Sequence, residues 1–186
     1  MKYINVVGNS AMGKSTFSKQ LAKKLSLAYI ELDNLYWKNN WEEPSNLEFF
    51  AKIKDQMDQY SDGWVMDGNY TKSIPVKWKH VDTVIWLDYP FHLNFYRSVK
   101  RALILSTVKK QLWPDSNNHE SFQKLFSRRS IVLWMMQQYR INREKYIALM
   151  ATKQYEHVNF IHLTSPKQAE DFLNSLDSFV LSNLQL

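Results

Sequence analysis

Residues 8–16 follow the pattern G-x-x-x-x-G-K-[ST], which is typical of a loop that binds phosphate groups. The loop consists of Gly8, Asn9, Ser10, Ala11, Met12, Gly13, Lys14, Ser15 and Thr16. Glycines let such a loop curl until successive N–H groups point at phosphate oxygens, and the N-terminus of the next helix favours anions. Lys14 supplies a mobile charge for the β- and γ-phosphates, and the Ser15 hydroxyl suits Mg²⁺. The loop therefore predicts binding of ATP with Mg²⁺.

A magnesium ion also favours a carboxylate nearby, often through water. Asp33, Asp67 and Asp88 each follow an apolar run that predicts a strand. We expect Asp67 to take this role because Gly68 leaves room beside it, with Asp33 and Asp88 as alternatives. The competing interpretation of each aspartate is a turn or helix-cap residue.

Several arginines recur at helical spacing, and phosphoryl transfer needs positive charge around the migrating group. Arg97 and Arg101 are four residues apart on a predicted helix and share a face. Arg129, Arg140 and Arg143 fall within a stripe of roughly 60° if their helix is unbroken. We expect catalytic roles for Lys14, Arg97, Arg101, Arg140 and Arg143; the alternative is a solvated basic face.

Aromatic and polar residues follow the predicted strand ends and suggest a pocket for a phosphate acceptor. Aromatic rings at such positions are able to stack on a base or ring. The residues that we expect to line this acceptor pocket are Asp33, Tyr36, Trp37, Asn69, Tyr70 and Lys77. The five histidines show no metal-ligand spacing.

The elements that must position these residues alternate along the chain. Apolar runs predict strands at 3–7, 28–32, 63–66, 82–87 and 157–163, and helical periodicity predicts helices at 14–26, 45–60, 91–108 and 120–151. Ser165 and Pro166 open a last helix as N-cap and first helical residue. This alternation predicts a three-layer α/β fold with a five-stranded parallel sheet of order 2-3-1-4-5. Ligands of such sheets bind beyond the carboxyl ends of the strands, where all the motifs fall.

Length and composition fit one globular domain over residues 1–186, with 45% hydrophobic and 23% charged residues. The absence of cysteine excludes a disulfide scaffold and a cysteine-ligated zinc site. No apolar run approaches the ~18–20 residues that span a bilayer, and no signal-peptide pattern occurs, so we expect a cytoplasmic protein without membrane contact. The net charge of +6 suits a nucleic acid, a small polyanion such as a nucleotide, or simply a solvated basic surface.

The sequence resembles the adenylate-kinase-like P-loop proteins, and most closely those labelled "DNA topology modulation protein". The resemblance covers about residues 1–146 and rests on the phosphate-binding loop, on residues 31–37, 64–70 and 84–90, and on Arg97-x-x-x-Arg101. It implies a nucleoside-monophosphate-kinase-like P-loop NTPase fold with a helical, mobile lid and with ATP at residues 8–16. It also implies an acceptor-binding insertion at about 34–62 and a lid at about 109–130.

The sequence departs from this family at three positions. Glu31 stands where the family usually has His, Lys77 where it has Arg, and Trp113 where it has the Arg of an Arg-Pro-Asp segment. The last two changes each remove a donor that is able to bind phosphate through two hydrogen bonds. From the phosphate-binding loop and the resemblance we expect a kinase that moves the γ-phosphate of ATP to a nucleotide, nucleoside or similar metabolite. The missing donors leave a nucleotide-binding protein or weak ATPase without transfer activity as one alternative. A second alternative is an ATPase associated with nucleic acid, which the short chain disfavours.

Overall fold

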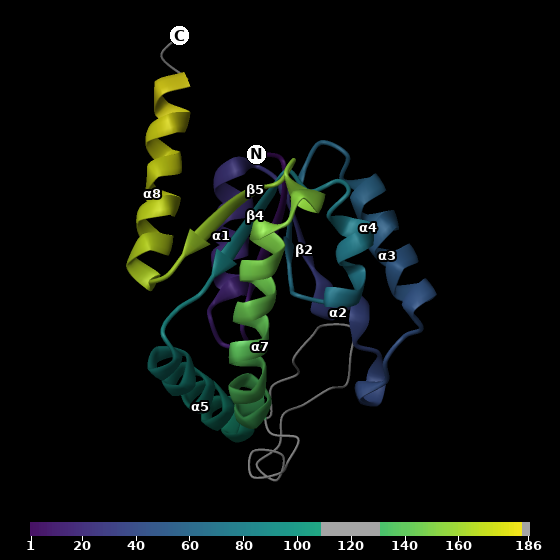
Figure 1. The fold of residues 1–186 in the computed structure, drawn as a ribbon, viewed down its shortest axis with the longest axis vertical. Coiled ribbons are helices and arrows are strands. Elements are labelled where there is room, and N and C mark those ends of the chain that lie inside the picture. Colours follow the sequence, from purple (N-terminus) through teal and green to yellow (C-terminus); the bar gives the residue numbers. More distant parts are fainter. Residues whose placement is uncertain (109–130, 184–186) are drawn as a thin grey trace.

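A computed structural model describes residues 1–108 and 131–183. Its centre is a five-stranded parallel sheet of order β2-β3-β1-β4-β5 (Figure 1). The strands are β1 (Tyr3–Gly8), β2 (Ala28–Glu31), β3 (Trp64–Asp67), β4 (Thr83–Leu87) and β5 (Asn159–Leu163). This confirms the strand number, the parallel pairing and the strand order predicted from the sequence.

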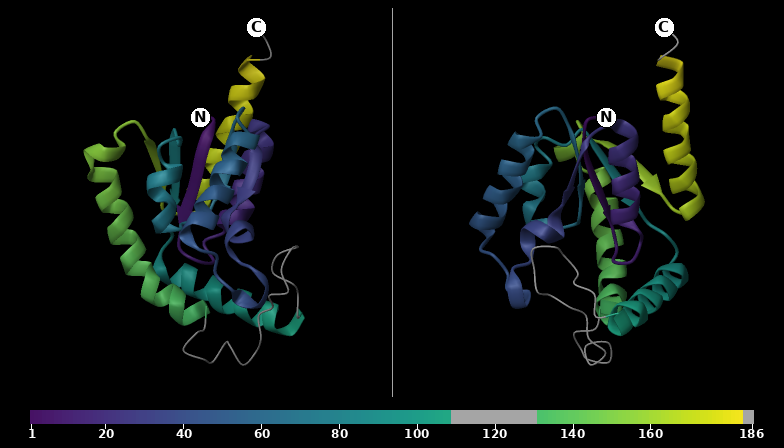
Figure 2. Two further views of the ribbon diagram at one scale, coloured as in Figure 1. Left: turned by 90° about the vertical axis from the view of Figure 1, so that its right-hand side faces the viewer. Right: turned by 180° about the vertical axis from the view of Figure 1, so that it is seen from behind.

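Helices cover both faces of the sheet, as the two views of Figure 2 show. The longer ones are α1 (Lys14–Leu25), α3 (Asn46–Gln59), α5 (Phe91–Val108), α7 (Ile131–Ala151) and α8 (Pro166–Asn183). Short segments are α2 (Leu32–Tyr36), η1 (Asn39–Trp41), η2 (Thr71–Ser73), α4 (Ile74–Lys77) and η3 (Lys153–Tyr155). Helices α1 and α8 pack on one face and α3, α4 and α7 on the other, while α5 lies beyond the carboxyl ends of the strands (Figure 1).

Alternation along the strands divides the core into these two layers. In β3, Val65 faces the α1/α8 layer, whereas Trp64 and Met66 face the opposite layer. All three are at most 1% exposed. Both faces of the central strands are therefore buried, as expected for a parallel sheet between helices.

Most predicted boundaries are reproduced within one or two residues, and Ser45 and Ser165 accept the capping hydrogen bonds of α3 and α8. One prediction about an element is wrong: β2 stops at Glu31, and Asp33 lies inside the short helix α2 rather than at a strand end. A Cβ at Gly68 would lie 2.9 Å from Leu32 Cβ, so the glycine allows Leu32 to pack closely against the end of β3. The predicted lid at about 109–130, with Trp113 and Arg129, lies outside the described residues. Within the described ranges, no helix is long and apolar enough to cross a membrane.

Candidate active site

The phosphate-binding loop joins the end of β1 to the start of α1, and two glycines determine its path. At Gly8 (φ +148°), a Cβ would lie 2.5 Å from the Leu87 carbonyl oxygen on β4. Gly13 (φ +91°) has a left-handed conformation that favours glycine, and its carbonyl accepts the first hydrogen bond of α1 from Phe17 N. The glycines of the motif are thus required by the backbone, and they leave the N-terminus of α1 open to an anion.

Lys14 and Asp67 lie at the base of this loop. The Lys14 ammonium donates to the Asn9 carbonyl oxygen at 3.1 Å. Burial lowers the pKa of Lys14; Arg101 adds to the shift, and Asp67 and Asp33 oppose it. Arg101, Asp67 and Asp33 therefore lie close enough to the Lys14 ammonium to influence its protonation.

Asp67 is 4% exposed and has one carboxylate oxygen without a partner in the described structure. Its Oδ2 accepts from the Tyr29 hydroxyl at 3.3 Å, whereas Oδ1 is buried and unpaired. Burial raises the pKa of Asp67, and the Lys14 ammonium and the Ser15 hydroxyl oppose that rise. An unpaired hard oxygen beside a serine hydroxyl fits Mg²⁺. The described residues contain no cluster of three acidic or histidine ligands.

A cavity of about 1070 Å³ opens from the loop towards α5 and α8. On one wall, Arg97 donates from Nη1 to the Met12 carbonyl oxygen at 3.3 Å, and its guanidinium lies 5.4 Å from the centre of the Tyr89 ring. Arg101 lines the same cavity. The opposite wall comes from α8, with Pro166, Ala169, Glu170, Leu173 and Asn174. The structure therefore brings Arg97 and Arg101 together with the phosphate-binding loop.

Comparison with solved structures identifies the fold. Shikimate kinase from Acinetobacter baumannii, in complex with shikimate, superposes with a TM-score of 0.58 and 16% sequence identity over 98% of this chain and 94% of that one. The chain has the P-loop kinase fold. An unliganded sugar kinase from a Janibacter species gives a TM-score of 0.51 and 16% identity, covering 95% of both chains. No family model and no curated protein matches the sequence.

Within this P-loop kinase fold, Asn69 contacts the phosphate-binding loop itself. Its Oδ1 accepts from Gly8 N at 3.0 Å, and its Nδ2 donates to Gly8 O at 2.9 Å. The same Oδ1 accepts from the Tyr146 hydroxyl of α7 at 3.1 Å. The Asn69 amide is thus occupied in fixing the first residue of the loop, rather than facing an acceptor.

Tyr70 and Asp33, two of the residues predicted to line an acceptor pocket, are joined by a hydrogen bond. The Tyr70 hydroxyl donates to Asp33 Oδ1 at 2.6 Å, although Tyr70 has an unusual φ of +28°. The Ser73 backbone N and hydroxyl both donate to the Tyr70 carbonyl oxygen, at 2.8 and 2.7 Å, which holds the strained turn. The Tyr36 ring packs 4.6 Å from that of Tyr70, and Trp37 lies 5.0 Å from Tyr36. The structure therefore brings Asp33, Tyr36, Trp37 and Tyr70 together, and their role in binding an acceptor stays a prediction.

Lys77 lies next to the turn at residues 68–70 and is completely buried. Its ammonium donates to the carbonyl oxygens of Gly68 (3.2 Å) and Asn69 (2.8 Å). Burial lowers the pKa of Lys77 to about 7, with a smaller contribution from Lys145. The amine points into the protein and supports the turn that carries Asn69 and Tyr70.

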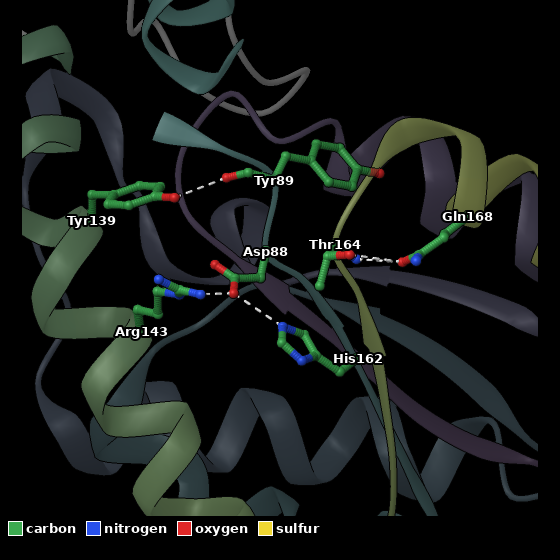
Figure 3. Close-up of polar contacts among 7 residues, drawn as sticks. All are labelled: Asp88, Tyr89, Tyr139, Arg143, His162, Thr164 and Gln168. Carbon is green, nitrogen blue, oxygen red and sulfur yellow. Dashed lines mark hydrogen bonds and ion pairs between the residues drawn. The ribbon is translucent and has the colours of Figure 1, made fainter. Parts of the chain in front are cut away.

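Arg140 and Arg143 of α7 have different partners and different exposure, although the sequence predicts that they share a stripe. Arg143 Nε lies 3.0 Å from Asp88 Oδ2, which also lies 3.0 Å from His162 Nε2 (Figure 3). Arg140 instead pairs with Glu144 on the surface, its side chain 87% exposed. Asp88, which is an alternative metal ligand in the sequence, is therefore occupied in joining α7 to β5.

Three tyrosines contact predicted site residues, although the sequence predicts a role in the site for none of them. Tyr29 contacts Asp67, Tyr89 lies under Arg97, and Tyr146 contacts Asn69. Tyr146 is three residues after Arg143, so helical spacing places both on neighbouring positions of α7. Tyr29 and Tyr89 carry no comparable signal, because their partners lie on other elements, Asp67 on β3 and Arg97 on α5.

Proposed function

We propose that this chain is a Mg²⁺-dependent kinase that transfers the γ-phosphate of ATP to a hydroxyl group of a small molecule. One observation carries the proposal: Lys14, Arg97 and Arg101 line one cavity at the phosphate-binding loop, and Arg97 donates to the Met12 carbonyl oxygen of that loop at 3.3 Å. A triphosphate bound by the loop would place its terminal group between these charges. That is the arrangement phosphoryl transfer requires.

Each residue then has a chemical role. Residues 8–16 bind the phosphates through backbone N–H groups, and Lys14 contacts the β- and γ-phosphates. Arg97 and Arg101 stabilise the negative charge that spreads over the transferred group. Ser15 and Asp67 hold Mg²⁺, which neutralises phosphate charge when bound. Asp33, oriented by Tyr70, accepts the proton of the acceptor hydroxyl.

Similarity to other proteins supports a kinase without naming the acceptor. The shikimate kinase neighbour is bound to a small molecule, and the second neighbour is a sugar kinase. The resemblance to adenylate-kinase-like proteins supports ATP as the donor, and we propose a cytoplasmic location. The label "DNA topology modulation protein" remains part of that resemblance, and no described feature favours a nucleic acid.

The buried state of Lys77 favours a second candidate, a nucleotide-binding protein without transfer activity. In that case the chain binds Mg-ATP but lacks a cation for the acceptor, because the Lys77 amine is occupied by backbone carbonyl groups. A screen of ADP release from Mg-ATP against nucleosides, nucleoside monophosphates, sugars and other hydroxylated metabolites separates the two. Acceptor-stimulated ADP release that disappears in Lys14→Met supports the kinase. ATP binding by calorimetry without stimulation by any acceptor contradicts it.

A further inference from the structure

We infer, building on the proposed kinase function, that Asn9 is a positioning residue that couples the phosphate-binding loop to helix α7. A bound nucleotide then stabilises the attachment of α7 to the loop. In turn, the attached helix holds the loop in the form that binds phosphate, and by linkage the two effects have the same magnitude. The Asn9 side chain carries this coupling, whereas the proposed phosphate contacts come from backbone N–H groups.

The Asn9 amide connects the loop directly to the backbone of α7. Its Nδ2 donates to the Met135 carbonyl oxygen at 2.9 Å. Asn9 is 3% exposed and Met135 is 0% exposed, so water does not compete for this hydrogen bond. The loop motif accepts any residue type after its first glycine, so the motif by itself does not require an asparagine here. The contact with α7 gives the asparagine a physical reason.

The second polar atom of the amide supports a functional role. Asn9 Oδ1 is buried and has no hydrogen-bond partner in the described structure. A buried oxygen without a partner lowers the stability of the fold, and leucine, which has nearly the same shape, would avoid this. A residue that carries such an atom is expected where function uses it. The use that the structure shows is the Nδ2 donor to α7.

Asn9 also contacts the cation that is proposed to bind phosphate. Its carbonyl oxygen accepts from the Lys14 ammonium at 3.1 Å and from Met12 N at 3.4 Å. When Lys14 turns to the β- and γ-phosphates, Asn9 loses the lysine as a support. The hydrogen bond to α7 then matters more for holding Asn9 in the bound chain than in the free chain. This difference gives the coupling its sign: attachment of α7 favours nucleotide binding, and binding favours attachment.

A second attachment of α7 lies one residue earlier in the loop. Asn69 Oδ1 accepts both from Gly8 N, at 3.0 Å, and from the Tyr146 hydroxyl of α7, at 3.1 Å. Met135 and Tyr146 are eleven residues apart, about three helical turns, so both attachments lie on one face of α7. The same helix carries Arg143, one of the arginines predicted to act in transfer. The attachment of α7 therefore sets the position of this arginine relative to the loop.

Hydrogen exchange of the full chain tests the coupling. Exchange is followed by mass spectrometry with and without Mg²⁺ and the non-hydrolysable analogue adenosine 5′-(β,γ-imido)triphosphate. In the wild type we expect the analogue to slow exchange about tenfold, both at the start of α1 and in residues 131–142 of α7. Protection of α1 without protection of α7 overturns the inference. Absence of protection at α1 counts against nucleotide binding and hence against the proposed function on which the inference rests.

Asn9→Leu removes the donor and keeps nearly the same side-chain shape. We expect the analogue to bind about fivefold more weakly, because the loop loses one support. At saturating analogue, α1 should stay protected, whereas the protection of residues 131–142 should fall by about fivefold. Asn9→Ala, which removes the same donor without adding bulk, is the second variant and should show the same loss.

Asn142→Leu is the matched control. It replaces another buried asparagine, which lies on α7 itself and accepts from Lys145 Nζ at 2.8 Å. We expect this variant to keep the analogue affinity of the wild type and the protection of α7. Wild-type protection of α7 in both Asn9 variants overturns the inference. An equal loss of protection in Asn142→Leu also overturns it, because the effect would then arise from the packing of α7 in general.

Discussion

The side-chain amide of Asn69 forms two hydrogen bonds with the backbone of Gly8, one to its N–H and one to its carbonyl oxygen. Asn69 thus fixes the residue at which β1 passes into the phosphate-binding loop. Because Tyr70 follows directly and donates to Asp33, one turn connects the phosphate-binding loop to Asp33. The Asp-Gly-Asn-Tyr segment, residues 67–70, is therefore a structural link within the site.

Replacing Asn69 with alanine should lower both stability and nucleotide affinity. The substitution leaves the N–H and carbonyl of Gly8 without these partners, and we expect the free energy of unfolding to fall by about 2 kcal/mol. Urea denaturation and Mg-ATP calorimetry measure the two effects. Tyr146→Phe, which removes one donor to Asn69, should cost less, and Asn46→Ala at an exposed site should cost little. Unchanged Mg-ATP affinity in Asn69→Ala would show that the turn does not position the loop.

Lys14→Met should weaken Mg-ATP binding far more than it affects folding. The charge-assisted contact to phosphate is lost, and we expect the dissociation constant to rise roughly 10- to 100-fold. The free energy of unfolding should not fall, because burial disfavours the charged ammonium in the folded state. Calorimetry and thermal denaturation are compared with Lys23→Met, an exposed lysine on the same helix. Equal affinity in the two variants would refute the role of Lys14.

Asp67→Asn should weaken the dependence of nucleotide binding on Mg²⁺ without unfolding the chain. Asparagine keeps an oxygen for the Tyr29 hydroxyl but removes the negative charge that attracts the metal. Because burial raises the pKa of Asp67, its ionised form is disfavoured in the folded state, and we expect equal or greater stability at pH 7. A Mg²⁺ titration of ATP affinity, with Asp62→Asn as the exposed control, tests this. An unaltered titration would transfer the role to Asp33.

Tyr70→Phe should lower kcat by about tenfold while Mg-ATP affinity stays within twofold of the wild type. The ring remains in the aromatic cluster with Tyr36, but Asp33 loses the hydrogen bond that orients its carboxylate. Steady-state kinetics with the acceptor found in the screen separate kcat from KM. The control is Tyr60→Phe on the surface. A change in ATP affinity alone would indicate that Tyr70 serves the loop rather than Asp33.

Lys77 should make stability depend on pH between about 7 and 10.5. The folded chain releases this proton near pH 7, whereas the unfolded chain holds it to about 10.5, so the unfolded state binds more protons in this window. The free energy of unfolding therefore rises with pH there, by up to about 1.4 kcal/mol per pH unit. In Lys77→Met this contribution should vanish, whereas exposed Lys72→Met should keep it. Urea denaturation across pH 6–10 measures how steeply the free energy of unfolding changes with pH. Equal slopes in the wild type and in Lys77→Met would contradict a lowered pKa of Lys77 in the folded chain.

The sequence alone determined the layout of the fold. Strand and helix periodicities, together with the motif at residues 8–16, predicted the parallel sheet and its order, and the structure confirms both. These signals are local: the spacing of apolar residues selects the element, and parallel strands with short connections allow few topologies. The glycines of the loop are recognisable because they recur at fixed positions of the motif, although the close approach of Gly8 to Leu87 on β4 is visible only in the structure.

Tertiary structure decided what the polar side chains do. The sequence places Arg140 and Arg143 on one stripe, but only Arg143 has a buried partner, Asp88. It places Lys77 in the acceptor pocket, but packing buries the amine against carbonyl groups that lie eight and nine residues away. The hydrogen-bond partner of a side chain depends on which elements pack together in the tertiary structure, and residue type and spacing do not predict that packing.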